Sequence, residues 1–197
     1  MAFADLYKAV QELDGRISTR DLKTLAIEHS DIKGVRELWT GLFDPLRLRG
    51  CYIEGPGRFM NVDVPPNEAL IVISREMVGA KPNGKHWRRL VFTKELMHVF
   101  DTPAEKADTE AKFDIQIQRF GDPTLEMSPQ FRAESKALYR ALMVLCREAT
   151  RQEYNKQLAA GGATPDYIAT ALHLPVPYIH YLFQENFPEM TAALLKE

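Results

Sequence analysis

The sequence predicts a single α+β domain, on the basis of three observations. Apolar residues recur at helical spacing near both ends of the chain. Between them, ALIVIS at 69–74 is a continuous apolar, β-branched run, which is typical of a buried strand. A helical pattern that is apolar almost all round follows at about 85–101, so this helix is expected inside the domain. A small sheet packed against helices accommodates both patterns.

The composition is that of a globular protein without a strong charge bias. The 197 residues are 45% hydrophobic and 26% charged, and the formal net charge is -2. This balance gives no bulk attraction to nucleic acid or to an anionic membrane. The N-terminal stretch lacks the apolar core of a signal peptide, and no apolar run has the length of a membrane span. We expect a cytoplasmic protein that does not contact membranes.

Residues 1–50 are predicted to form an N-terminal helical segment. Apolar stripes place helices at 3–13, at about 18–29 and at 34–43. The period then changes, and two short strands are expected at 48–53 and 58–64, around the hairpin-type turn Gly55-Pro56-Gly57.

The rest of the chain divides into a core at 51–160 and a C-terminal short-helix segment at 161–197. In the core, 102–127 is polar and is expected to form a loop with a short helix. Ser128-Pro129 is a good helix start, and the helix it opens could continue to Gly161-Gly162. The C-terminal segment is expected to pack on the core or to form a protein interface.

The stretch VFTKELMHVFD, residues 91–101, differs in one position from the zinc-protease motif His-Glu-x-x-His. In that motif two histidines, one helical turn apart, hold the metal, and the glutamate between them deprotonates a metal-bound water. Glu95 and His98 are present, but Lys94 stands in place of the first histidine. An ammonium has no lone pair and cannot ligate zinc. A simpler interpretation is that Lys94 and Glu95 are solvated and that His98 is a hydrogen-bonded core residue.

The surroundings of this motif resemble the ImmA/IrrE family of gluzincin-type metallopeptidases. The similarity rests on the strand ALIVISREM, the segment RRLVFTKELMHVFD and the downstream helix AESKALYRALMVLCREA, and it extends over about 53–183. Lys94 and Met97 depart from the family pattern. The resemblance implies a zincin-like core in which a long helix from Ser128 faces the motif helix. It places either Glu134 or Ser135 in the position of the third metal ligand.

The resemblance implies an inactive or impaired metallopeptidase homologue of bacterial or phage origin, which acts as a regulatory module by binding a protein partner. In this interpretation Lys94 substitutes for the zinc ion and pairs with Glu134 or Glu95, so the remnant of the site is Lys94, Glu95, His98 and Glu134 and no cofactor is expected. The alternative is an active zinc peptidase with Glu95 as general base, His98 and Glu134 as metal ligands, and a third ligand that the sequence does not identify.

A third alternative is a regulator that binds DNA through the N-terminal third. Three helices followed by a two-stranded ribbon is the order of a winged-helix domain. Four arginines would then face phosphate, of which Arg36 and Arg49 are the main candidates and Arg47 and Arg58 the others. Against this, residues 1–50 contain as many acidic as basic side chains.

The remaining polar residues are interpreted as structural or solvated. Cys51 and Cys146 have no metal or redox spacing and are expected to be buried free thiols. Four carboxylates are interpreted as solvated surface: Asp101, Glu105, Asp108 and Glu110. The other histidines have no partner at ligand spacing: His29, His86, His173 and His180.

Overall fold

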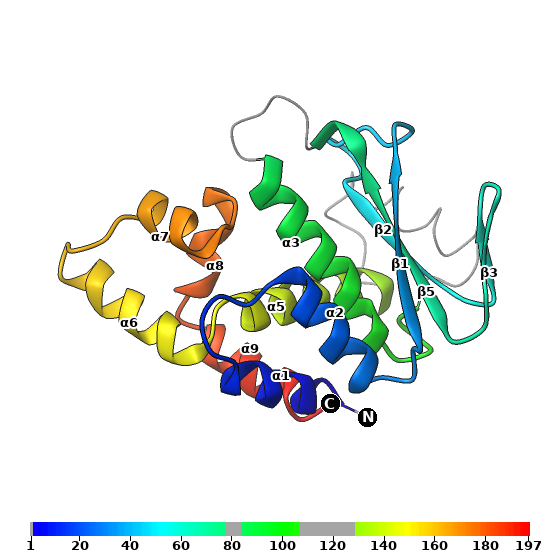
Figure 1. Ribbon diagram of the computed structural model, residues 1–197. Helices are drawn as coiled ribbons and strands as arrows, with labels where there is room; N and C mark the ends of the chain where they lie inside the picture. The colour runs from blue at the N-terminus through cyan, green and yellow to red at the C-terminus, as the bar shows by residue number, and fades with distance from the viewer. Residues whose placement is uncertain (1, 78–83, 107–128) are drawn as a thin grey trace.

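The computed structural model describes residues 2–77, 84–106 and 129–197. These residues form eight α-helices, a mixed three-stranded sheet and a separate two-stranded hairpin, which confirms the α+β class (Figure 1). The helices lie on one side of the sheet, and the hairpin lies on the other (Figure 1). Within the described residues, no helix is long and apolar enough to cross a membrane.

The chain begins with two helices, α1 (Phe3–Glu12) and α2 (Thr19–Glu28). Ser18 caps α2, since its hydroxyl accepts a hydrogen bond from the Asp21 amide while the Asp21 carboxylate accepts one from the Ser18 amide. The prediction of a third helix at 34–43 is wrong, because Gly34–Thr40 forms strand β1. The spacing of the apolar residues in this segment fits the period of a helix as well as that of a strand. Parallel pairing with the central strand of the sheet favours the strand.

The sheet has the order β1-β5-β2, and its central strand β5 (Glu68–Ser74) is the buried strand predicted from ALIVIS. Strand β1 pairs with β5 in parallel, and β2 (Gly50–Glu54) pairs with it in antiparallel orientation. Ile71, Val72 and Ile73 are fully buried. A strand with helices on one face and the hairpin on the other has no solvated side, which explains its continuous apolar sequence.

The predicted strand at 58–64 is divided into β3 (Gly57–Phe59) and β4 (Val62–Val64), which pair only with each other. The expected pairing of 48–53 with 58–64 is therefore wrong. The backbone at Gly55 lies so close to Pro65 that a Cβ atom there would be 1.9 Å from the Pro65 carbonyl oxygen. This close approach requires glycine and directs the chain out of the sheet into the hairpin.

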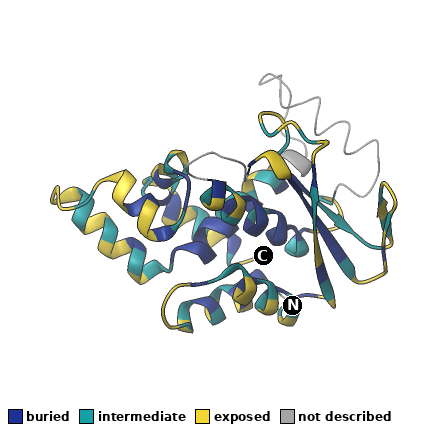
Figure 2. Cartoon of the chain, turned by 45° about the horizontal axis from the view of Figure 1, so that its top comes forward, coloured by how far each residue is buried: buried dark blue, intermediate teal, exposed yellow. Residues whose placement is uncertain are grey.

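Two central helices position the site. Helix α3 (Gly84–Leu96) continues into a 3₁₀ turn (Met97–Phe100), and α5 (Pro129–Leu145) packs against it. Both are mostly buried (Figure 2), as predicted for the motif helix and its facing helix. The face of α5 toward the core is lined by small residues, which allow the two helices to approach closely: Ala133, Ala137 and Ala141.

The long helix predicted to reach Gly161 is interrupted, because α5 ends at Leu145 and α6 (Glu148–Ala159) begins after Arg147. Arg147 has an extended backbone, and its guanidinium donates hydrogen bonds to the carbonyls of Leu13 and Gly15. These contacts with the α1–α2 loop are invisible in the local sequence. Ser128 and most of the predicted loop with a short helix at 102–127 lie outside the described residues.

The C-terminal residues form α7 (Pro165–Leu172), a 3₁₀ turn (Val176–Tyr178), α8 (Ile179–Leu182) and α9 (Phe187–Leu194). Thr164 caps α7, as its Thr-Pro-Asp start predicts. The buried residues of these helices belong to the same apolar core as those of α1, α3 and α5. The C-terminal segment thus packs on the core, one of the two outcomes expected of it.

Candidate functional site

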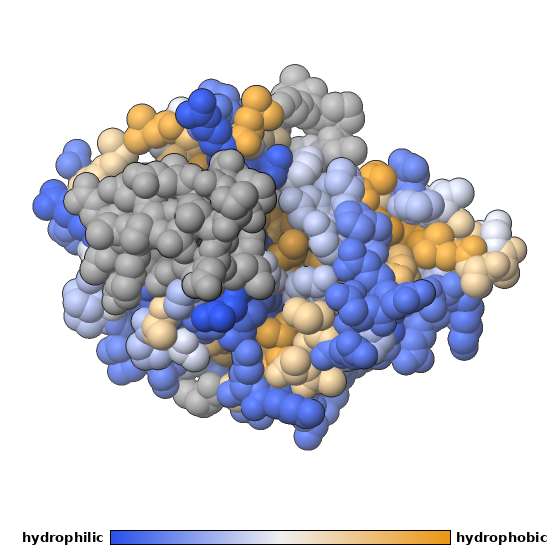
Figure 3. Space-filling view, turned by 180° about the vertical axis from the view of Figure 1, so that it is seen from behind, coloured by the Kyte–Doolittle hydropathy of each residue, from blue (hydrophilic) through white to orange (hydrophobic). Residues whose placement is uncertain are grey.

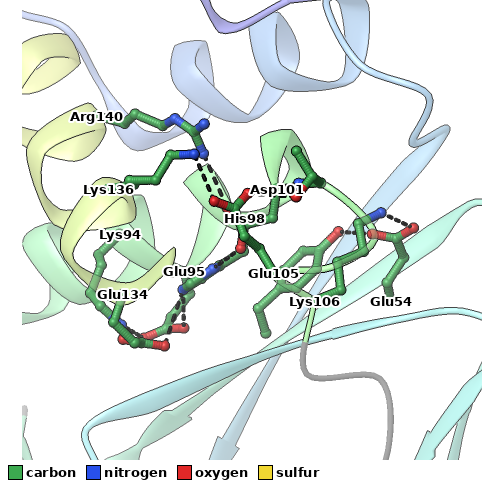
Figure 4. A network of polar contacts seen from close by, with 12 residues as sticks. Glu54, Lys94, Glu95, His98, Asp101, Glu105, Lys106, Glu134, Lys136 and Arg140 are labelled. Atoms are coloured by element: carbon green, nitrogen blue, oxygen red, sulfur yellow. Dashed lines mark hydrogen bonds and ion pairs between the residues drawn. The ribbon is translucent and has the colours of Figure 1, made fainter. Parts of the chain in front are cut away.

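The end of α3 and the start of α5 bring together the four residues of the predicted site remnant (Figure 4). The Lys94 ammonium lies 3.0 Å from Oε1 of Glu95 and also contacts Oε2 of Glu134. Nε2 of His98 lies 3.4 Å from Oε1 of Glu134 and 3.8 Å from Oε2 of Glu95. Ser135 is exposed, so Glu134 is the residue of the two candidates that faces the motif helix.

A second group of charges, which the sequence interpretation missed, adjoins His98. Nδ1 of His98 lies 2.6 Å from Oδ2 of Asp101, and the other carboxylate oxygen accepts a hydrogen bond of 3.0 Å from Arg140. Arg140 is 1% exposed and Asp101 8%, so the prediction that Asp101 is solvated is wrong. The 3₁₀ turn that ends α3 directs Asp101 inward, toward α5. The three-residue spacing of His98 and Asp101 could have predicted their pairing, but nothing in the local sequence indicates that Arg140 joins them.

The network continues outward on both sides of this group. On the α5 side, Lys136 pairs with Glu105 at 2.7 Å and with Glu197 at 2.8 Å. Glu105 is therefore half-buried and paired rather than freely solvated, which corrects its assignment. On the sheet side, Glu54 accepts a hydrogen bond of 2.8 Å from Tyr52, whose ring lies 6.0 Å from that of His98. Asp108 and Glu110 lie outside the described residues.

The proton affinities of the site follow from these contacts. Burial alone would lower the pKa of His98, but the charge of Glu134 and the hydrogen bonds that the imidazolium donates to Asp101 and Glu134 outweigh it and raise this pKa to about 10. Burial likewise opposes the charge on Lys94, yet Glu134 and Glu95 hold its pKa above the ordinary value. In the reverse sense, burial would raise the pKa of Glu134, and the cations Lys94 and His98 lower it.

At neutral pH the site therefore contains equal positive and negative charge. Its cations are the Lys94 ammonium, the His98 imidazolium and the Arg140 guanidinium, and each lies against a carboxylate. Those carboxylates belong to Glu95, Glu134 and Asp101. We call these six residues the charge cluster. A buried cluster of this kind is stable only when every charge has a partner, because an isolated ion in the interior is costly.

The charge cluster does not fit a zinc ion. The ammonium of Lys94 contacts both carboxylates, Glu95 and Glu134, that would face a metal at this position, and it cannot itself act as a ligand. His98 and Glu134 alone supply two ligands, whereas zinc sites use three or four. Within the ranges that the structure describes, no group of three or more His, Cys, Asp or Glu side chains is arranged to hold a metal.

The arginines proposed for DNA contacts are engaged within the protein. Arg36 pairs with Glu68 at 3.3 Å and donates to the carbonyl of Asp63, while Arg49 stacks on Trp87 at 4.2 Å from the ring centroid. The other two pair with nearby aspartates, Arg47 with Asp44 and Arg58 with Asp63. Because β1 replaces the third helix, the helix–helix–helix–hairpin order on which this alternative depended is absent from this N-terminal third, which the structure describes from residue 2.

The cysteines are free and buried, as predicted for both Cys51 and Cys146. Two of the scattered histidines meet in space, since the rings of His86 and His173 lie 5.3 Å apart. Their separation in the sequence gave no signal for this contact. His180 packs on Tyr181, with 4.0 Å between ring centroids.

Comparison with protein-family models, with curated proteins and with solved structures gives no match to this chain. The ImmA/IrrE resemblance therefore stays a prediction from the motif residues. Fold and site together define an α+β protein with a buried, charge-balanced cluster between its two central helices.

Proposed function

We propose that this protein is a non-catalytic relative of the zincin-type metallopeptidases and that it acts by binding a protein partner. The observation that supports the proposal is the position of Lys94, whose ammonium contacts Glu95 and Glu134 at the same time. In this proposal the covalently attached ammonium of Lys94 provides the positive charge that the metal ion provides in a peptidase of this type.

This substitution removes the chemistry as well as the metal. The glutamate of such a site works by deprotonating a water that the metal has acidified. Here Glu95 is 3% exposed, and its carboxylate lies 3.0 Å from the Lys94 ammonium, in an ion pair rather than beside a metal-bound water. The backbone of Gly50, at the start of β2, packs close to the Glu95 side chain, since a Cβ atom at Gly50 would lie 3.2 Å from Cγ of Glu95. Glu95 is thus held as a structural counterion.

An active zinc peptidase would require Lys94 to leave the charge cluster and another ligand to enter it. Departure of the ammonium would leave the carboxylates of Glu95 and Glu134 with only the His98 imidazolium to balance their charge in a partly buried site. The arrangement of the described residues offers no third ligand to replace it. This supports the non-catalytic alternative over the catalytic one.

The role that such a scaffold retains without catalysis is recognition of a protein, in a bacterial or phage regulatory setting. The support for this role is analogy at the level of the fold and of the motif residues. On the face that Figure 3 shows, the described surface is mostly hydrophilic, with separate apolar patches. We place the protein in the cytoplasm, with neither a metal nor another cofactor.

Metal analysis and a proteolysis assay test the proposal together. Protein purified without chelator should contain far less than one zinc per chain, and added zinc should elicit no chelator-sensitive hydrolysis of an unfolded protein substrate. A protein partner captured by the native chain should be recovered uncleaved, and the Glu95→Gln variant should capture it equally well. Stoichiometric zinc that is lost in His98→Ala, or cleavage of the partner that stops in Glu95→Gln, would contradict it.

A further inference from the structure

A cavity of about 210 Å³ lies where the α1–α2 loop, α3, the α5–α6 junction and α7 meet. None of the residues of the charge cluster lines it. Its wall contains three arginines from three separate segments, Arg16, Arg89 and Arg147, together with Thr150 and Tyr154 of α6. An open cavity that gathers three guanidinium groups is a candidate binding site for an anion.

Main-chain carbonyls and a histidine hold the three arginines in place. Arg89 donates a hydrogen bond of 2.6 Å to the carbonyl of Ile17, and Arg147 donates one of 2.8 Å to that of Gly15. Arg16 lies 2.8 Å from Nε2 of His173. Among the residues that the structure describes, no carboxylate lines the cavity and none forms an ion pair with these arginines. The carbonyl contacts orient the guanidinium groups and leave their charge uncompensated.

One donor of this group is also unused. Nε of Arg89 is buried and has no hydrogen-bond partner within the described residues. A buried donor without an acceptor is costly, and such groups in proteins commonly serve a bound molecule.

The electrostatic potential at the cavity is positive, as the pKa shifts of the neighbouring cationic groups indicate. The pKa of Arg89 is lowered to about 10, first by burial and then by the charge of Arg16. The pKa of His173 is lowered in the same way, by burial and by the charges of Arg16, His86 and Arg89. The first turn of α6, which begins at Glu148 and includes Thr150, adds the positive end of its helix dipole.

We propose that this cavity binds the phosphate group of a small organic phosphate, either a monoester or a diphosphate. Phosphate matches three guanidinium groups because it carries nearly two negative charges and accepts bidentate hydrogen bonds from arginine. A single carboxylate would leave most of the positive charge unbalanced. The apolar part of the wall, formed by Ile17, Leu145 and Leu172, receives a short organic group beside the phosphate.

Calorimetric titration with pyrophosphate, at constant ionic strength, tests the site. The Arg16→Gln variant removes one exposed guanidinium without touching the core, and we expect it to weaken pyrophosphate binding about tenfold, as for the loss of one charge-assisted hydrogen bond. Arg20→Gln, which removes an equally exposed charge from α2 outside the cavity, is the matched control and should leave the affinity unchanged.

A second pair of variants keeps the test independent of folding defects. Thr150→Glu places a carboxylate among the three arginines, at a position in the first helical turn where glutamate is well tolerated. It should abolish pyrophosphate binding while Thr150→Gln retains it. The proposal is overturned if the native protein does not bind pyrophosphate, if Arg16→Gln and Arg20→Gln weaken it equally, or if citrate binds as tightly as pyrophosphate.

Discussion

Lys94 of α3 and Glu134 of α5 form an ion pair between the two central helices. The side chain of Lys94 is 22% exposed and that of Glu134 17%, so water screens the pair only partly. Glu95 completes the contact from the same helix as Lys94. The pair thus joins the motif helix to the helix that faces it, at the place where the resemblance to metallopeptidases puts a metal.

Substitution of Lys94 by methionine should destabilise the fold, although methionine preserves the length and apolar stem of the side chain. Glu95 and Glu134 would lose the cation that both contact, and breaking a buried pair by removing one partner costs about 3 kcal/mol, an upper figure for this partly exposed pair. Denaturant unfolding should show this loss at pH 7, and the double variant Lys94→Met/Glu134→Gln should recover part of it. Lys156→Met, at an exposed position of α6, serves as the control and should change stability little. Equal effects of the two lysine substitutions would contradict the assigned role of Lys94.

His98 should be an imidazolium at neutral pH. Its pKa of about 10 lies above the ordinary value of 6.5, because Glu134 and Asp101 stabilise the charged ring more than burial disfavours it. Nitrogen NMR of the histidine ring should therefore show both nitrogens protonated at pH 7 to 8, whereas a neutral ring there would be inconsistent with the cluster.

The same shift predicts how stability changes with pH. The folded-state pKa is raised, so the contribution of His98 is fully present below about pH 6.5 and is lost as the pH rises toward about 10. The difference in unfolding free energy between the native protein and His98→Gln should therefore shrink across this interval. A difference that grows with pH would mean that the ring is buried in its neutral form.

The carboxylate of Asp101 should account for part of the raised pKa of His98. Substitution by asparagine retains the shape of the side chain but removes the charge that lies 2.6 Å from Nδ1 of His98 and 3.0 Å from Arg140. We expect the pKa of His98 to fall and the protein to lose stability, because Arg140 is 1% exposed and would keep only Glu197, at 2.8 Å, as a carboxylate partner. The control Asp14→Asn, at an exposed position, should alter neither quantity in an NMR titration and a denaturant melt.

The two thiols should resist alkylation in the folded protein. Burial raises the pKa of Cys146 to about 12 and also raises that of Cys51, so neither forms the reactive thiolate at pH 8. Iodoacetamide labelling should be slow in buffer and complete in denaturant. Rapid labelling of the native protein would show that these positions open to solvent.

The elements predicted correctly are those whose pattern of apolar residues fits only one type of secondary structure. The continuous apolar run of β5 and the nearly all-round apolar pattern of the motif helix both indicate burial, and the structure buries β5 and the C-terminal half of α3. Residues 34–40 were ambiguous, because Val35, Leu38 and Trp39 fit a helical stripe as well as a strand. Pairing with β5 decided between them, and that pairing is a tertiary event.

In the candidate site, too, the residues that a local sequence pattern connects were predicted, and those brought together only by tertiary contacts were not. The motif placed Lys94, Glu95 and His98 on one helix end, and the resemblance offered Glu134 or Ser135, of which only Glu134 faces the motif helix. Arg140 was missed because its partner Asp101 enters the core only after the 3₁₀ turn that ends α3. The three arginines of the cavity come from segments far apart in the sequence, and no local pattern connects them.

Zinc titration of the native protein and of Lys94→His tests the central claim, that Lys94 occupies the position of a metal. The variant restores His-Glu-x-x-His, and with Glu134 it offers three ligands. Calorimetry should show no stoichiometric binding to the native chain, one zinc bound per chain of Lys94→His, and loss of that binding in Lys94→His/His98→Ala. Stoichiometric zinc on the native protein that depends on His98, or the failure of Lys94→His to bind zinc, would contradict the account.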